Sequence, residues 1–99
     1  MKKKTITTYL WDAAAHLETD EDMALYLEAA LEEKDPALIS AVLGDIARAK
    51  GMGQIAEKTG LGRTSLYKAL SPDGHPEFAT ILKVVDALGL ELCVTPVKE

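Results

Sequence analysis

The chain has 99 residues, of which 47% are hydrophobic, and it carries a formal net charge of −5 and a single cysteine, Cys93. This length fits one domain with its own core, the hydrophobic share excludes wholesale disorder, and one cysteine excludes an intrachain disulfide. Because no apolar stretch approaches the ~20 residues of a membrane helix, and no apolar run follows the lysines near the start, we expect a cytoplasmic protein with no membrane partner.

The charges are unevenly distributed along the sequence. Residues 5–47 hold ten acidic residues against Lys34 alone, whereas residues 48–72 hold five basic residues against Glu57 alone. Salt screens charges beyond about 8–10 Å, so a local field matters more for DNA binding than the net charge does. The basic block therefore leaves DNA binding open, and the acidic block is either a solvated surface or a surface for a basic partner.

Residues 4–11 are rich in β-branched and aromatic side chains and form a candidate β-strand. Thr19 followed by Asp22 is typical of a helix capping pair, and the helix that follows is expected to end near Lys34. Leu25 lies off the buried stripe of this helix. The stripe is formed by Met23, Tyr26, Leu27, Ala30 and Leu31.

A second helix is expected to begin at Asp35-Pro36 and to end at Gly51, because Asp caps a helix, Pro suits its first position and Gly suits its end. Its buried stripe is formed by Ile39, Val42, Leu43, Ile46 and Ala47. Towards the C-terminus, Pro76 opens a further helix that Gly89 closes. The apolar stripe of this last helix is formed by Phe78, Ile81, Leu82, Val85 and Leu88.

Residues 90–97, LELCVTPV, alternate apolar side chains with other residues, which predicts a short half-buried β-strand. The backbone of a strand needs a pairing partner, and the candidates are residues 4–11 or the same strand of a second subunit. We expect a homodimer joined through this C-terminal region. Cys93 lies within the strand and is interpreted as a small buried residue rather than a nucleophile.

Residues 52–71, MGQIAEKTGLGRTSLYKALS, predict a helix-turn-helix with helices at about 53–59 and 63–70. Gly60 occupies the tight turn, where a positive φ is cheap only for glycine. The apolar residues at the packing positions are Ile55, Leu61 and Leu66. The alternative interpretation is a plain helical hairpin within an all-α core.

The second helix of this motif presents side chains that suit DNA contacts. Arg63 can donate two hydrogen bonds to guanine, and Thr64 can contact a base edge or a thymine methyl group. Gln54, Tyr67 and Lys68 are better suited to phosphates, which fix the position of a protein on the duplex. The candidate DNA-binding residues are Gln54, Arg63, Thr64, Ser65, Tyr67 and Lys68.

The sequence offers no arrangement of residues for catalysis or for metal binding. His16 and His75 are distant from each other, and neither stands in a cysteine or carboxylate set at metal-ligand spacing. We therefore expect no catalytic residues, no metal and no cofactor, and a protein that is not an enzyme.

From Asp35 to Pro96 the sequence resembles the XRE/Cro/CI helix-turn-helix superfamily and, more closely, the addiction-module antidote proteins, a HigA-like antitoxin family. The most specific segments are GDIARAKGM, SLYKALSPDGHP and VVDALGLEL, and WDAAAHLETDEDMALYLEAALEE resembles the family's N-terminal extension. The resemblance implies a mainly α fold: a five-helix lambda-repressor-like helix-turn-helix domain at 35–99 with the short C-terminal strand. Residues 1–34 would be an acidic extension that binds a partner.

The same resemblance implies a function: a DNA-binding antitoxin of a type II toxin-antitoxin module. Such a protein neutralises a RelE/HigB-like ribonuclease toxin and, as a homodimer on double-stranded operator DNA, represses its own operon. Composition and spacing by themselves indicate only DNA binding. The alternatives are a stand-alone phage-type or bacterial repressor without a toxin, and an interaction module that has lost DNA affinity. The acidic block at 5–47 favours the antitoxin, because it would attract a cationic toxin.

Overall fold

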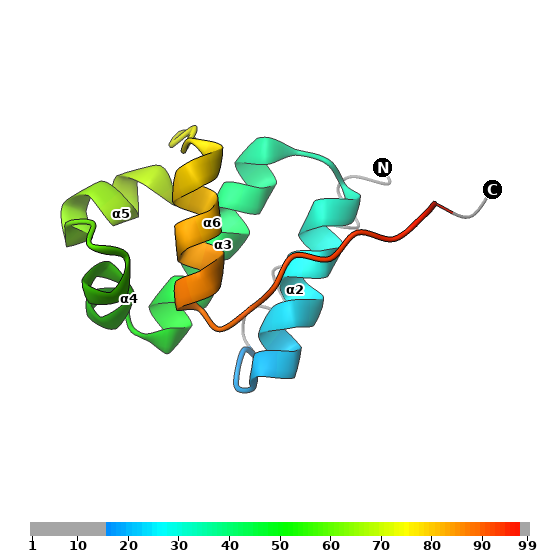
Figure 1. Cartoon of the computed structure of the whole chain (residues 1–99), viewed down its shortest axis with the longest axis horizontal. Helices are drawn as coiled ribbons and strands as arrows, with labels where there is room; N and C mark the ends of the chain where they lie inside the picture. Colours follow the sequence, from blue (N-terminus) through cyan, green and yellow to red (C-terminus); the bar gives the residue numbers. More distant parts are fainter. Residues whose placement is uncertain (1–15, 98–99) are drawn as a thin grey trace.

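The computed structural model describes residues 16–97, which form five helices and no β-strand (Figure 1). The helices are α2 (Asp20–Glu32), α3 (Pro36–Lys50), α4 (Met52–Thr59), α5 (Arg63–Ala69) and α6 (Phe78–Ala87). Helices α4 and α5 lie at one end of the molecule and α2 at the other, with α3 and α6 between them. The predicted mainly α class is confirmed. No helix in this part of the chain has both the length and the apolar character needed to cross a membrane.

The first two helices begin where capping side chains satisfy their free backbone N–H groups. The Thr19 hydroxyl accepts a hydrogen bond from the Asp22 N–H at 3.0 Å, and the Asp22 carboxylate accepts one from the Thr19 N–H at 3.1 Å. These bonds favour the charged carboxylate, so the pKa of Asp22 lies below its ordinary value. At α3, Asp35 caps the helix and Pro36 holds its first position. Both predicted helix starts are confirmed.

One apolar core joins the five helices. Its buried side chains are Met23, Tyr26, Leu27, Ala30, Val42, Leu43, Ile46, Ala47, Met52, Ile55, Ala56, Leu66, Leu70, Val84, Val85 and Leu88. Every helix from α2 to α6 contributes to this set. Burial of aliphatic side chains stabilises a fold by about 25 cal/mol per Å² of apolar surface, so removing α2 would expose its partner face on α3. The stability of the fold therefore depends on α2.

Polar contacts also fix α2 on α3. The Tyr26 hydroxyl of α2 donates a hydrogen bond to Asp45 Oδ2 of α3 at 2.5 Å, and Arg48 donates to Asp45 Oδ1 at 2.7 Å. Near the start of α2, the Asp20 carboxylate forms an ion pair with Lys50 Nζ at 2.9 Å. Burial of the phenol, together with its bond to Asp45, raises the pKa of Tyr26 well above its ordinary value.

The predicted C-terminal strand is not confirmed by this structure. Residues 90–97 run alongside α2 in an extended course (Figure 1), and Leu92 packs against the core, but the segment is not a strand. The physical reason is that no described segment pairs with its backbone. The candidate strand at 4–11 lies outside the described residues. Cys93 is exposed, so the interpretation of this residue as buried is wrong.

The last helix differs from its prediction in two ways. It begins at Phe78 and not at Pro76, because Glu77 still has extended backbone with φ −68° and ψ 153°. Phe78 and Leu82 were expected in the buried stripe, yet both side chains are exposed. No other described element covers the edge of α6 that carries them. Gly89 ends the helix in the left-handed region with φ 77°, as expected of a C-terminal glycine.

Candidate functional site

Helices α4 and α5, with the connection between them, occupy the residues where the sequence predicts a helix, a turn and a second helix. The bounds differ from the prediction by one residue at the outer end of each helix. Gly60 adopts the left-handed conformation with φ 77°, and its N–H donates to the Ala56 carbonyl at 3.0 Å. A residue with a Cβ would be strained there, so the predicted role of Gly60 is confirmed.

Thr59 ties the end of α4 to this turn. Its hydroxyl donates to the Ile55 carbonyl at 2.9 Å and accepts a hydrogen bond from the Leu61 N–H at 3.3 Å. The side chain is partly buried, and these bonds satisfy it without water. The turn is therefore held by a side chain as well as by the glycine conformation.

The candidate DNA-binding residues lie on the exposed side of this unit. Those residues are Gln54, Arg63, Thr64, Ser65, Tyr67 and Lys68, and all six are exposed. Leu66 of α5 and Leu70 directly after it point into the core, so the 100° turn per residue places Thr64 and Lys68 on the opposite side and Tyr67 on the flank of the helix. The Arg63 guanidinium lies beside the first turn of α4, 4.0 Å from where a Cβ at Gly53 would stand. The structure therefore brings these side chains to one end of the molecule.

The positive charge of this unit is smaller than the sequence block at 48–72 suggests. Two of its five basic residues, Arg48 and Lys50, form ion pairs with acidic residues of α3 and α2. The basic residues of the block that form no ion pair within residues 16–97 are Lys58, Arg63 and Lys68. Counting charges in a sequence block misses such pairs because the neutralising acids belong to other helices.

Two glycines hold the C-terminal end of α5 in place. A Cβ at Gly44 of α3 would overlap the carbonyl oxygen of Leu70, and a Cβ at Gly74 would overlap that of Ala69. The Ser71 hydroxyl adds a hydrogen bond to the last turn of α5, at 2.8 Å from the Lys68 carbonyl. The sequence analysis missed these roles. A glycine inside a helix costs about 1 kcal/mol, so Gly44 carried a signal of close packing.

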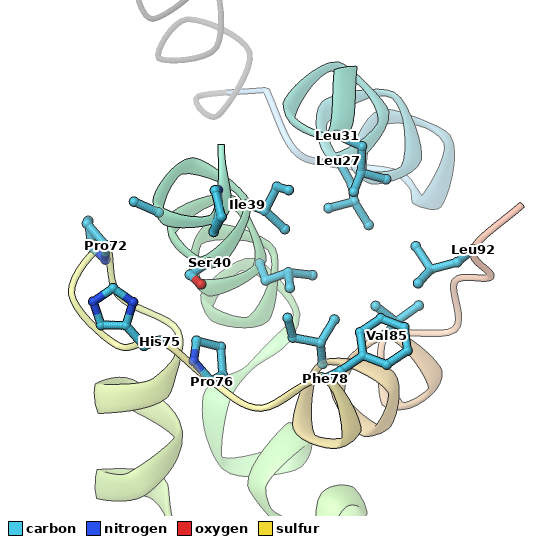
Figure 2. Close-up of a pocket in the computed structure, with 14 residues that line it drawn as sticks. Leu27, Leu31, Ile39, Ser40, Pro72, His75, Pro76, Phe78, Val85 and Leu92 are labelled. Atoms are coloured by element: carbon cyan, nitrogen blue, oxygen red, sulfur yellow. The ribbon is translucent and has the colours of Figure 1, made fainter. Parts of the chain in front are cut away.

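A second surface feature is an apolar groove of about 370 Å³ between α2, α3, the loop at 72–76 and α6. Figure 2 shows Leu27 and Leu31 of α2 facing Phe78 and Val85 of α6 across it, with Leu92 of the C-terminal segment at one side. We refer to this feature as the α2–α6 groove. It was not predicted, because its residues are distributed over most of the sequence.

The described residues contain no group of three or more histidine, cysteine, aspartate or glutamate side chains that could hold a metal ion. The α4–α5 end offers hydrogen bonds and charge, and the α2–α6 groove offers apolar contact.

Comparison with known proteins gives the family. A family model described as a probable addiction module antidote protein matches residues 7–96. The chain is also 50% identical over 84 residues to an uncharacterized protein of Haemophilus influenzae, a match that covers 85% of this chain and 87% of the relative. No solved structure shows significant similarity to the chain. Because the family model spans nearly the whole sequence, the chain belongs to the family of probable addiction module antidote proteins.

Proposed function

We propose that this chain is an antitoxin that binds operator DNA through α4 and α5 and represses its own operon as a homodimer. Membership of an antidote family implies a toxin partner. The resemblance to HigA-like antitoxins of the XRE/Cro/CI superfamily supports a RelE/HigB-like ribonuclease as that partner, and a lambda-repressor-like arrangement of the helices. In this proposal the chain is a binding protein and not an enzyme.

The observation that carries the DNA-binding proposal is the exposed side of α5. An α-helix with its side chains is about 10–12 Å across and fits the major groove, which is about 12 Å wide. With Leu66 and Leu70 buried, α5 turns Thr64 and Lys68 outward, and Arg63 stands at its start. In this arrangement Arg63 and Thr64 read base edges, whereas Lys68 binds a phosphate.

The start of α4 suits a second phosphate contact. No side chain caps this helix, and the Gln54 N–H donates to the Gly51 carbonyl at 3.1 Å, so the N–H groups of Met52 and Gly53 are the ones available to an anion. Gly53 lies in that turn and is exposed, and its lack of a side chain permits close approach of a phosphate oxygen. Gln54 is exposed next to it and can donate a further hydrogen bond.

The C-terminal segment supports the dimer. The backbone of residues 91–97 pairs with no described segment, and Val94 is 97% exposed. Val97 adds further exposed apolar surface in the same segment. Pairing with a second copy would satisfy the backbone and cover these side chains. A two-fold dimer then presents two copies of α5 to half-sites about 34 Å apart.

A mobility-shift titration with duplexes from the region upstream of the gene tests this proposal. Arg63→Ala should cost about 1–3 kcal/mol of binding free energy and relax base preference, whereas Lys68→Ala should weaken binding to all sequences alike. Lys34→Ala is the matched control, because Lys34 is an exposed lysine in the connection between α2 and α3, away from α4 and α5 (Figure 1). A palindrome with half-sites one helical turn apart should bind more tightly than a single half-site.

If Arg63→Ala and Lys68→Ala bind the operator as Lys34→Ala does, the assignment of this surface is wrong. If operator binding is normal but the neighbouring gene product has no effect on the chain, the stand-alone repressor becomes the better description.

A further inference from the structure

We infer that the α2–α6 groove is the site at which this chain binds its toxin, and that it receives an apolar anchor projecting from a basic protein surface. This inference rests on the antitoxin part of the proposed function and is independent of DNA binding. The sequence pattern suggests that the partner binds the acidic N-terminal region. We place the partner site in the α2–α6 groove instead.

The groove has the size and depth of a binding site. Its volume of about 370 Å³ falls within the range of about 300–1,000 Å³ that is usual for ligand sites. Leu27, Leu43 and Val85 form its buried floor, so a side chain that enters meets preformed apolar contacts. Leu31 and Phe78 stand on opposite sides (Figure 2), with 39% and 66% of their surfaces exposed. Such paired exposed apolar residues at a cavity are typical of an interface.

The charges beside the groove favour a basic partner. No lysine, arginine, aspartate or glutamate lines it, so the occupant's anchor has to be apolar. On α2, a helix turns 100° per residue, so Glu28 and Glu32 border the groove-facing Leu27 and Leu31 on their outward side. Across the groove, the exposed Glu77 precedes Phe78 in the chain. Opposite charges of this kind accelerate encounter and orient the partner.

Most lysines and arginines of the described residues lie on other surfaces; the exception is Lys34, which follows Glu32 and Glu33 at the end of α2. Lys50, Lys58 and Lys83 line a separate depression beside the C-terminal end of α6. The remaining basic residues of the α3–α5 region are Arg48, Arg63 and Lys68. No lysine or arginine lines the groove itself, and at its border Lys34 stands against three exposed glutamates, Glu28, Glu32 and Glu77.

This charge pattern also argues against a second copy of the chain as the occupant. Two copies that met through their grooves would bring the same acidic borders together, and like charges in contact oppose association. DNA is repelled for the same reason. A ribonuclease toxin, by contrast, needs a cationic surface to hold RNA, so it complements the acidic border while its apolar side chain fills the groove.

The structure offers matched variants for a test. On α2, Leu31 lines the groove, whereas Leu25 is 63% exposed and does not; on α6, Phe78 lines the groove, whereas Leu82 is 46% exposed and does not. The two residues of each pair are exposed apolar residues on the same helix, so substitution of either one removes exposed apolar surface. Only the groove variants remove contacts to an anchor seated in the groove.

The experiment measures binding of the tagged toxin encoded beside this chain to the full-length protein and to four variants. Leu31→Ser and Phe78→Ser should each raise Kd by about 10-fold to 100-fold, the range of central interface residues. Leu25→Ser and Leu82→Ser should change Kd by less than about 3-fold. Thermal unfolding of each variant confirms that it is folded. Reversing the charge at Glu28 and Glu32 together should slow association, with little effect at high salt.

The inference is overturned if Leu31→Ser and Phe78→Ser bind the toxin as tightly as the controls, or if Leu25→Ser causes the larger loss. In either case the antitoxin function stands and its site lies elsewhere. If the wild-type chain does not bind the toxin, the antitoxin function itself fails. The operator titration with Arg63→Ala is unaffected by any of these outcomes, so the failures are distinguishable.

Discussion

The α4–α5 end and the α2–α6 groove differ in how their surfaces are assembled. The exposed residues at the α4–α5 end come from one continuous stretch, 52–71, and a helix, a turn and a helix position them. The groove is assembled from five separate parts of the chain, between Leu27 and Leu92. A surface built by one local unit is visible in the sequence, because residue spacing encodes it. A surface built by packing of distant elements is not.

The same two surfaces differ in the chemistry that they offer. The α4–α5 end presents hydrogen-bond donors and unpaired basic side chains, which suit a phosphate backbone. The groove presents apolar side chains beside acidic ones, which suit a basic protein. In the two proposals above, one small domain binds two partners of opposite charge. The acidic residues beside the groove repel DNA, and the basic residues at the α4–α5 end repel a basic toxin.

The largest expected effect concerns the packing that fixes α5. Gly44→Ala would place a Cβ against the Leu70 carbonyl oxygen, and helix α3 or α5 would have to shift. We expect a loss of about 1–3 kcal/mol in the free energy of unfolding, measured in urea, and weaker operator binding as α5 moves. Gly53→Ala is the control for the free energy of unfolding only, because Gly53 lies at the proposed phosphate contact: its Cβ meets nothing closer than 4.0 Å, so it should stabilise the fold by about 0.5–1 kcal/mol. If Gly44→Ala and Gly53→Ala change the free energy of unfolding equally, the close contact between Gly44 and the Leu70 carbonyl oxygen is refuted.

Prediction from the sequence succeeded where a local pattern determines the structure. Capping at Thr19 and Asp35, the turn at Gly60 and the inward position of Leu66 all follow from residues within one turn of each other. The strand at 90–97 is not confirmed, because alternation fits any extended segment, and strand formation depends on a partner that the local sequence does not specify.

The sequence analysis did not identify the partners of several polar residues, and the reason is different. The bond from Tyr26 to Asp45 and the ion pair between Asp20 and Lys50 join residues that are far apart in the sequence. A helical pattern assigns Tyr26 to the buried stripe, which is correct, but it does not identify the partner of its hydroxyl. Such contacts follow from the packing of α2 on α3, and the groove follows from the same packing.

A smaller effect is expected at the Tyr26–Asp45 contact, which joins α2 to α3 outside the α2–α6 groove. Tyr26→Phe removes the hydrogen bond to a charged acceptor and should cost about 1–2 kcal/mol at neutral pH. Burial and the bond to Asp45 raise the pKa of Tyr26, so above pH ~10 the unfolded chain loses this proton while the folded chain keeps it. The free energy of unfolding should therefore fall as pH rises above ~10.

The variant Tyr26→Phe should lack that part of the alkaline decline, as measured by urea unfolding at several pH values. Tyr67→Phe is the control, since Tyr67 is exposed and its hydroxyl bonds to no described residue. An unchanged alkaline decline in Tyr26→Phe would mean that another group causes it.

The smallest expected effect tests whether ion pairs within the fold withdraw basic residues from DNA binding. Lys50 pairs with Asp20 at 2.9 Å, whereas Lys58 forms no ion pair within residues 16–97. Each lysine that neutralises a phosphate contributes about one unit to the slope of log affinity against log salt. We expect Lys58 to contact a DNA phosphate, so Lys58→Ala should lower that slope by about one, whereas Lys50→Ala should leave it unchanged. Operator titrations at several salt concentrations measure both slopes. A slope lowered equally by Lys50→Ala would show that the pair with Asp20 opens on DNA, and the sequence count of five basic residues would then be the better guide to this surface.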